Sequence, residues 1–180
     1  MIRETGMKNL VFLLALFVIV VIQATVMDYL RVFGVKPDLL LGFVVIVSVY
    51  SNWKAALLFS ILAGLFKDLF GSSGFGINIF LLPLWGCLIW KLSRKISIDD
   101  TIGISVTAFL TVLINDIASR MFYIYLGKYV SPGIFLRMML IGSLYTALAL
   151  PFLVQAFVYI NTMSYQRSDT PDFKKSDLTG

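Results

Sequence analysis

The residues whose types could do chemistry in this chain are acids and bases that stand inside long apolar segments. Asp116 lies one helical turn before Arg120, a spacing at which an acid and a base pair on a helix surface. Asp68 lies near the end of the apolar segment 53–70, and Arg137 lies near the start of another. Charged groups in such surroundings could carry a proton, bind a ligand or hold helices together by pairing.

Several other chemistries are excluded by what the chain lacks. It contains no histidine and a single cysteine, Cys87, so histidine-based catalysis, a zinc site and a disulfide framework are ruled out. The glycine-rich run GSSGFG is not followed by the Lys and Ser or Thr of a phosphate-binding loop. We therefore expect no enzyme, no catalytic residue, no metal and no cofactor.

Composition indicates the solvent in which these charges must be placed. Of 180 residues, 59% are hydrophobic and only 14% are charged, and the mean hydropathy is +0.90. A soluble domain of this size would need more polar residues to cover its surface. The sequence therefore predicts an integral membrane protein.

The apolar segments predict an all-α, polytopic fold with six transmembrane helices in one membrane domain, residues 1–160. The second segment is short, because about 14 residues at about 1.5 Å each span less than a hydrocarbon core of about 30 Å. The first is expected to be a retained anchor, since no small-x-small cleavage site follows it. Residues 161–180 are expected to form a disordered cytoplasmic tail. The six expected spans are 10–27, 38–51, 53–70, 75–90, 101–126 and 134–160.

The distribution of lysine and arginine predicts the orientation. Positively charged residues stay preferentially on the cytoplasmic side of short loops. An N-terminus in the cytoplasm puts nine of them there and six on the other side, and six spans then return the C-terminus to the cytoplasm. This asymmetry accounts for the net charge of +5 without a nucleic-acid partner. The nine are Arg3, Lys8, Lys54, Lys91, Arg94, Lys95, Arg167, Lys174 and Lys175.

A stripe of small residues leads to the acid of the third span. Ala56, Ser60, Gly64 and Asp68 recur every four residues, so they share one helix face on which another helix can approach closely. We therefore expect Asp68 to face protein, against the fifth or sixth span. Lys67 is turned by about 100° from it and is expected to extend to the outer headgroups.

The charged residues of the outer third of the membrane are expected to form one buried polar cluster, since an isolated charge costs a few kcal/mol there. Two interpretations are open. The cluster could fix how the spans pack, or it could be a site for a ligand or a partner helix. Its expected members are Asp68, Asn115, Asp116, Arg120 and Arg137.

Local signals mark one helix start and one turn. Pro37 suits the first turn of a helix and Asp38 stabilises the positive end of its dipole, so the pair predicts where the second span begins. Gly71, Ser72 and Gly76 belong to a run that predicts the outer turn between the third and fourth spans.

Taken together, three segments of the chain resemble the rod shape-determining protein MreD family. They are FGVKPDLLLGFVVIVSVY at 33–50, GLFKDLFGSSGFGINIF at 64–80 and INDIASRMFYIYL at 114–126. The resemblance covers about residues 8–160 and rests on the order and spacing of its motifs. The matching residues are Pro37, Asp38, Gly64, Asp68, Gly71, Ser72, Gly76 and Asp116.

The resemblance implies a bacterial inner-membrane scaffold of the cell-elongation machinery that regulates cell shape. Its implied partner is MreC, through which it would modulate lateral-wall peptidoglycan synthesis. MreB, the glycosyltransferase–transpeptidase pair, membrane lipid and a second copy of the chain are further implied partners. The family also resembles, in fold, the S-components of energy-coupling-factor transporters, so the alternative is a membrane binder of a small molecule or lipid intermediate.

Overall fold

The computed structural model describes residues 2–25, 29, 35–70, 76–96, 100–127 and 131–166. Every regular element in these ranges is a helix, as expected from the sequence. The helices are α1 (Ile2–Thr25), α2 (Leu39–Tyr50), α3 (Trp53–Phe70), α4 (Asn78–Ser93), α5 (Thr101–Tyr125) and α6 (Pro132–Gln166).

The expected segments and the observed helices agree best in the middle of the chain. The third span is observed with the predicted bounds, α2 differs from prediction by one residue at each end, and α5 differs by one residue at its end. Larger differences are found elsewhere: α4 is shifted by three residues at each end, α1 begins at Ile2, and α6 continues to Gln166, into the segment expected to be disordered. A helix needs only its own backbone hydrogen bonds to continue beyond an apolar run. Residues 167–180 lie outside the described ranges.

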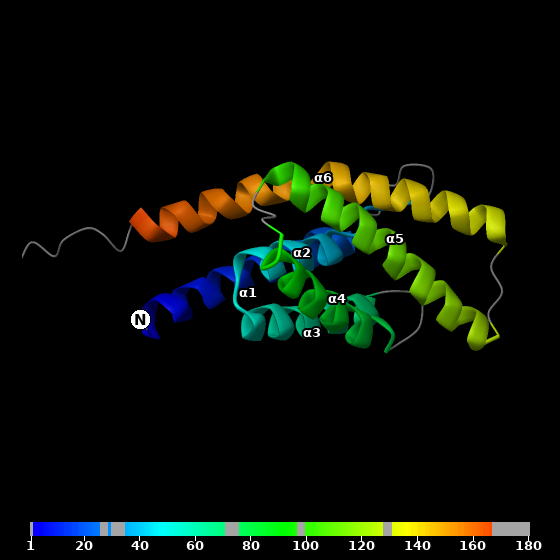
Figure 1. Cartoon of the computed structure of the whole chain (residues 1–180), viewed down its shortest axis with the longest axis horizontal. Helices are drawn as coiled ribbons and strands as arrows, with labels where there is room; N and C mark the ends of the chain where they lie inside the picture. Colours follow the sequence, from blue (N-terminus) through cyan, green and yellow to red (C-terminus); the bar gives the residue numbers. More distant parts are fainter. Residues whose placement is uncertain are drawn as a thin grey trace, which may run out of the picture.

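The helices run roughly along the long axis of the molecule, and the start of α1 lies at the same end as the end of α6 (Figure 1). Helices α3 and α4 form one closely packed pair, and α5 and α6 form another. Helix α2 lies between these pairs and contacts each of the other five helices.

Helix α2 is the centre of the core. All residues from Leu39 to Val49 are buried, which is the pattern of a helix that is apolar all round and enclosed by others. At 12 residues, it is only about 18 Å long. Its start lies inside the bundle, where Pro37 and Leu39 are buried, whereas Tyr50 at its end is 40% exposed.

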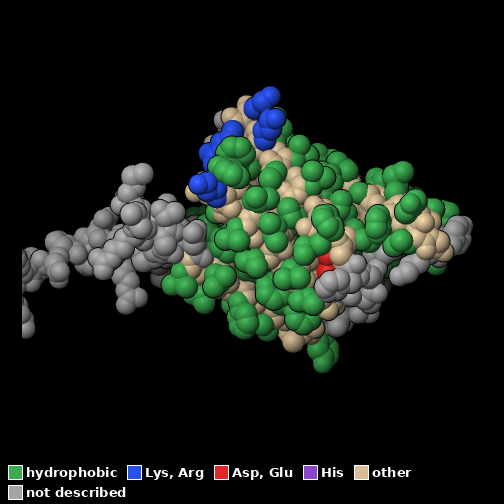
Figure 2. Space-filling model, turned by 90° about the horizontal axis from the view of Figure 1, so that it is seen from below, with side chains coloured by type: hydrophobic (Ala, Val, Ile, Leu, Met, Phe, Trp, Pro, Cys, Tyr) green, Lys and Arg blue, Asp and Glu red, His purple; other side chains and the backbone are tan. Residues whose placement is uncertain are grey.

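The outer surface of the bundle is apolar as well. Large side chains such as Phe80, Ile102 and Phe152 are at least 74% exposed. Figure 2 shows hydrophobic side chains over most of one face. Such a surface is unusual for a protein in water and suits lipid.

Length and composition identify two helices that could cross a membrane within the described residues. They are Thr101–Phe122 in α5 and Pro132–Tyr159 in α6. The segments Leu10–Thr25, Leu39–Tyr50 and Asn78–Ser93 are apolar but shorter. The six spans expected from the sequence therefore remain a prediction.

Candidate functional site

Helix α2 begins within one residue of the expected start, but Pro37, which was expected in its first turn, lies just before the N-cap. Oδ1 of Asp38 accepts a hydrogen bond of 3.0 Å from the backbone N–H of Leu41, so the acid is the N-cap of α2. Pro37 precedes it and is buried. Because α2 is short, this cap lies inside the bundle and not at its surface.

The second oxygen of Asp38 is paired with a base from α3. Oδ2 of Asp38 forms an ion pair with Nζ of Lys67, and the two side chains are 17% and 23% exposed. The prediction that Lys67 extends to the headgroups is therefore wrong. The start of α2 lies level with the last turn of α3, and pairing avoids two isolated charges in apolar surroundings.

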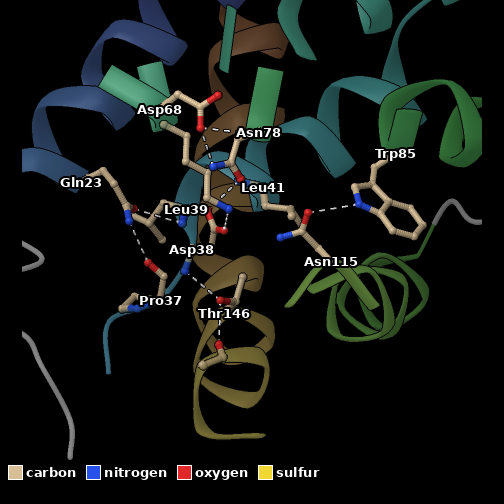
Figure 3. A network of polar contacts seen from close by, with 12 residues as sticks. Gln23, Pro37, Asp38, Leu39, Leu41, Asp68, Asn78, Trp85, Asn115 and Thr146 are labelled. Carbon is tan, nitrogen blue, oxygen red and sulfur yellow. Dashed lines mark hydrogen bonds and ion pairs between the residues drawn. The ribbon is translucent and has the colours of Figure 1, made fainter. Parts of the chain in front are cut away.

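Two further helices hold the same helix start. Gln23 of α1 accepts a hydrogen bond from the N–H of Leu39 and donates one to the carbonyl of Pro37, each at 3.1 Å. The N–H of Asp38 donates to Oγ1 of Thr146 in α6 at 2.8 Å. Figure 3 shows how these groups converge on the start of α2. We call Gln23, Pro37, Asp38, Lys67 and Thr146 the α2 hub.

Sequence reasoning missed Gln23 and Thr146 as members of this site. The signal that could have found them is a polar side chain inside an apolar segment, which usually has a protein partner. Both side chains bond backbone groups at the start of α2, and a pattern of side chains along the sequence does not predict such partners.

Helix α5 contributes a second acid near the hub. Asp116 is partly buried and interacts electrostatically with Lys67. The ion pair expected from its spacing to Arg120 does not form among the described residues, because the guanidinium of Arg120 lies 4.2 Å from the ring centroid of Phe135. Spacing of one turn makes a pair feasible but is worth only a few tenths of a kcal/mol, so tertiary contacts decide.

Asp68 is buried as expected, at 5% exposure, but its partners are different from those expected. Oδ1 accepts from the backbone N–H and the side-chain amide of Asn78, at 3.2 and 2.7 Å, and Oδ2 accepts from the N–H of Ile79 at 2.9 Å. The prediction of a cationic partner in the fifth or sixth span is therefore wrong. Asp68 stabilises the unpaired N–H groups at the start of α4, where a negative charge is favoured.

The small-residue stripe of α3 packs closely, against α4. A Cβ on Gly64 would lie 2.5 Å from the backbone oxygen of Asn78, and one on Gly86 would lie 2.2 Å from Oγ of Ser60. Ala56 and Ser60 are buried at the same contact. Close approach through this face was predicted correctly, whereas the neighbouring helix was not.

Of the other expected cluster members, Asn115 contacts Asp116 and also joins α5 to α4. Asn115 is buried and accepts a hydrogen bond of 3.2 Å from the indole N–H of Trp85, which joins α5 to α4. Arg137 is exposed near the start of α6. The cluster predicted for the outer third is thus found in part: Lys67 interacts electrostatically with Asp68 and Asp116, and Asn115 contacts Asp116, whereas Arg120 lies against Phe135.

The predicted outer turn is described only in part. Gly76 has φ +110°, which suits glycine, so its role as a turn residue is confirmed. Gly71 and Ser72 lie outside the described residues.

The arrangement favours structural chemistry at these positions. Within the described ranges, no group of three His, Cys, Asp or Glu side chains is placed to hold a metal ion. Both oxygens of Asp38 and both oxygens of Asp68 are engaged by protein donors. These acids therefore fix two helix starts, α2 and α4, inside one bundle.

Comparison of the chain with protein-family models, with curated proteins and with solved structures finds no match.

Proposed function

We propose that this chain is a multi-pass membrane scaffold of the bacterial cell-elongation machinery, with an MreD-like role, that binds MreC and modulates lateral-wall peptidoglycan synthesis. The observation that carries the proposal is the ordered set of motifs by which the sequence resembles that family. Four of the motif residues lie at helix starts or contacts. Pro37 and Asp38 lie at the start of α2, Asp68 contacts the start of α4, and Gly64 lies where α3 packs on α4.

These positions support a role in binding a partner chain. The motif residues hold the interior, which leaves the apolar outer surface of α1, α3, α5 and α6 to face lipid or another helix. A rigid interior with an apolar exterior suits a protein that presents helix faces in a membrane. In this role the chain acts by association with a partner and turns over no substrate.

The proposal includes location in the inner membrane, six crossings and both termini in the cytoplasm. The uneven distribution of lysine and arginine supports it. Fusions of alkaline phosphatase and of a cytoplasmic reporter after Gly180 test it. An active phosphatase fusion would mean an odd number of crossings. In that case α2, the shortest of the described helices, would not cross the membrane.

Capture of partners from the membrane tests the scaffold role. The tagged full chain is extracted in mild detergent, and bound proteins and small molecules are identified by mass spectrometry. We expect MreC to be recovered and depletion of the chain to round the cells. A stoichiometric small molecule or lipid intermediate without MreC would instead support the S-component-like binder, and conversion of a lipid-linked peptidoglycan precursor by the purified chain would contradict both.

A further inference from the structure

Four basic side chains gather where α3 begins and α4 ends. Lys54 lies in the first turn of α3, Lys91 in the last turn of α4, and Arg94 and Lys95 follow directly. All four are exposed. Figure 2 shows Lys and Arg side chains collected at one edge of a mostly apolar face. We call these four residues the basic patch.

The fold holds the two halves of the patch together. A guanidinium nitrogen of Arg94 donates a hydrogen bond of 2.9 Å to the carbonyl of Ser51, which lies just before α3. This bond joins residues 43 positions apart in the sequence. The patch is therefore a built surface of two helices and not a charged tail.

Two tryptophans mark the depth of the patch. Nζ of Lys54 lies 5.9 Å from the ring centroid of Trp53, and the guanidinium of Arg94 lies 6.0 Å from that of Trp90. Tryptophan is enriched at the membrane–water interface, where headgroups lie. The indole N–H of Trp90 is buried and finds no acceptor in the described part of the chain, so a donor adjoins the patch.

Among the described residues where α3 begins, α4 ends and α5 begins, the four basic side chains face a single acid, Asp100. Lys91 and Lys95 are four residues apart, a spacing at which like charges repel. Two acids follow in the sequence: Asp99 lies outside the described residues, and Asp100 is the N-cap of α5, where it accepts from the N–H of Gly103 at 3.3 Å. An anion shared by the basic side chains would relieve the repulsion.

Apolar side chains continue from the patch along α4. Leu88 lies about one helical turn before Lys91 and Leu92 directly follows it, and these leucines are 53% and 39% exposed. The surface thus offers cations at headgroup depth and an apolar face next to them. A phospholipid has the complementary form, with a phosphate above acyl chains, whereas an acidic protein segment would leave the leucines unused.

We propose that the basic patch binds the phosphate of an anionic glycerophospholipid in the leaflet that faces the ends of α3 and α4. The proposal requires the chain to lie in a membrane, and it does not depend on the partner assigned above. The lipid phosphate lies among the basic side chains, and its acyl chains lie along the exposed face of α4.

The test uses the purified full chain in neutral detergent. Phosphatidylglycerol and phosphatidylcholine with the same acyl chains are titrated, and bound lipid is measured by native mass spectrometry and by the rise in Tm. Soluble glycerol phosphate forms a third arm. We expect phosphatidylglycerol to bind more tightly than phosphatidylcholine, and soluble glycerol phosphate to bind far more weakly than phosphatidylglycerol.

Matched variants locate the site. The double variant Lys91→Gln with Lys95→Gln is expected to weaken phosphatidylglycerol binding about 25-fold, from about fivefold for each basic residue near an anionic surface. Arg94→Gln is expected to weaken it about fivefold. The control is Lys36→Gln, which removes an exposed lysine just before α2, at the other end of the bundle, and should leave binding unchanged.

Three results would overturn the proposal. They are equal binding of the two lipids, equal loss in the Lys36→Gln control, and binding of glycerol phosphate as tight as that of the lipid. An acidic protein captured through the patch, without preference among lipids, would also overturn it. None of these results bears on the scaffold role, which is tested by recovery of MreC.

Discussion

The ion pair between Asp38 and Lys67 should contribute measurably to the free energy of unfolding. Lys67→Met keeps the aliphatic length of the side chain and leaves Oδ2 of Asp38 without its partner inside the bundle. Removal of one member of a buried pair costs about 3–5 kcal/mol in soluble proteins. Here the cost should be smaller, because the two side chains are 17% and 23% exposed and Oδ1 keeps its bond to Leu41.

We therefore expect Lys67→Met to lower the free energy of unfolding by about 2 kcal/mol, between the soluble values and the average of about 0.6 kcal/mol for hydrogen bonds in membrane helices. A double-mutant cycle isolates the pair. Asp38→Asn keeps an oxygen that can cap α2 but removes the charge, and the coupling with Lys67→Met should be about 1–2 kcal/mol.

The assay is unfolding of the purified chain in mixed micelles, followed by circular dichroism. Lys91→Met is the control, since Lys91 is an exposed lysine at the other end of the bundle. If Lys67→Met leaves the free energy of unfolding unchanged and the coupling is below about 0.5 kcal/mol, the reasoning is refuted. The lysine would then extend to the headgroup region, as the sequence predicted.

Three further predictions follow from the same contacts. Asp68→Ala removes the acceptors at the start of α4 and should cost about 1–3 kcal/mol in unfolding free energy, whereas Asp68→Asn should cost less; equal losses would contradict a capping role. Gly64→Ala places a Cβ against the backbone of α4 and should lower the free energy of unfolding by about 1–3 kcal/mol. Gly133→Ala is its control and should be neutral in the same unfolding assay, because a Cβ there meets open space, with no atom of a neighbouring helix within 4 Å. Thr146→Val leaves an N–H at the start of α2 without its acceptor and should cost about 1–3 kcal/mol. Thr107→Val is its control, because that hydroxyl bonds only within α5, and an equal effect of both valines would argue against the hub.

The α2 hub and the basic patch lie at opposite ends of the bundle and should respond differently to conditions. The ion pair of the hub is mostly buried, so it should be less sensitive to salt than the patch. The patch is exposed, so lipid binding there should weaken as ionic strength rises. Parallel measurements at two salt concentrations would separate the contributions of the two regions.

The sequence by itself determined the features that depend on a few neighbouring residues. Apolar composition and segment length predicted an all-helical chain, and the bounds 53–70 of α3 were correct. Pro37 and Asp38 predicted the start of α2, because a proline before a capping acid satisfies local requirements of φ and of unpaired N–H groups. The stripe through Gly64 predicted a close helix contact, since small side chains allow one wherever the partner lies.

Only the tertiary structure decided which groups meet. Lys67 pairs with a residue 29 positions away because α2 is short and begins level with the end of α3, and no spacing in the sequence gives that depth. Asp68 meets the start of α4 because α3 packs on α4 through Gly64. Asp116 lies near Lys67 and not on Arg120, because a pair at one-turn spacing gains too little to compete with contacts between helices. Partner choice is a property of how the helices are placed relative to one another, which the pattern along any one helix does not contain.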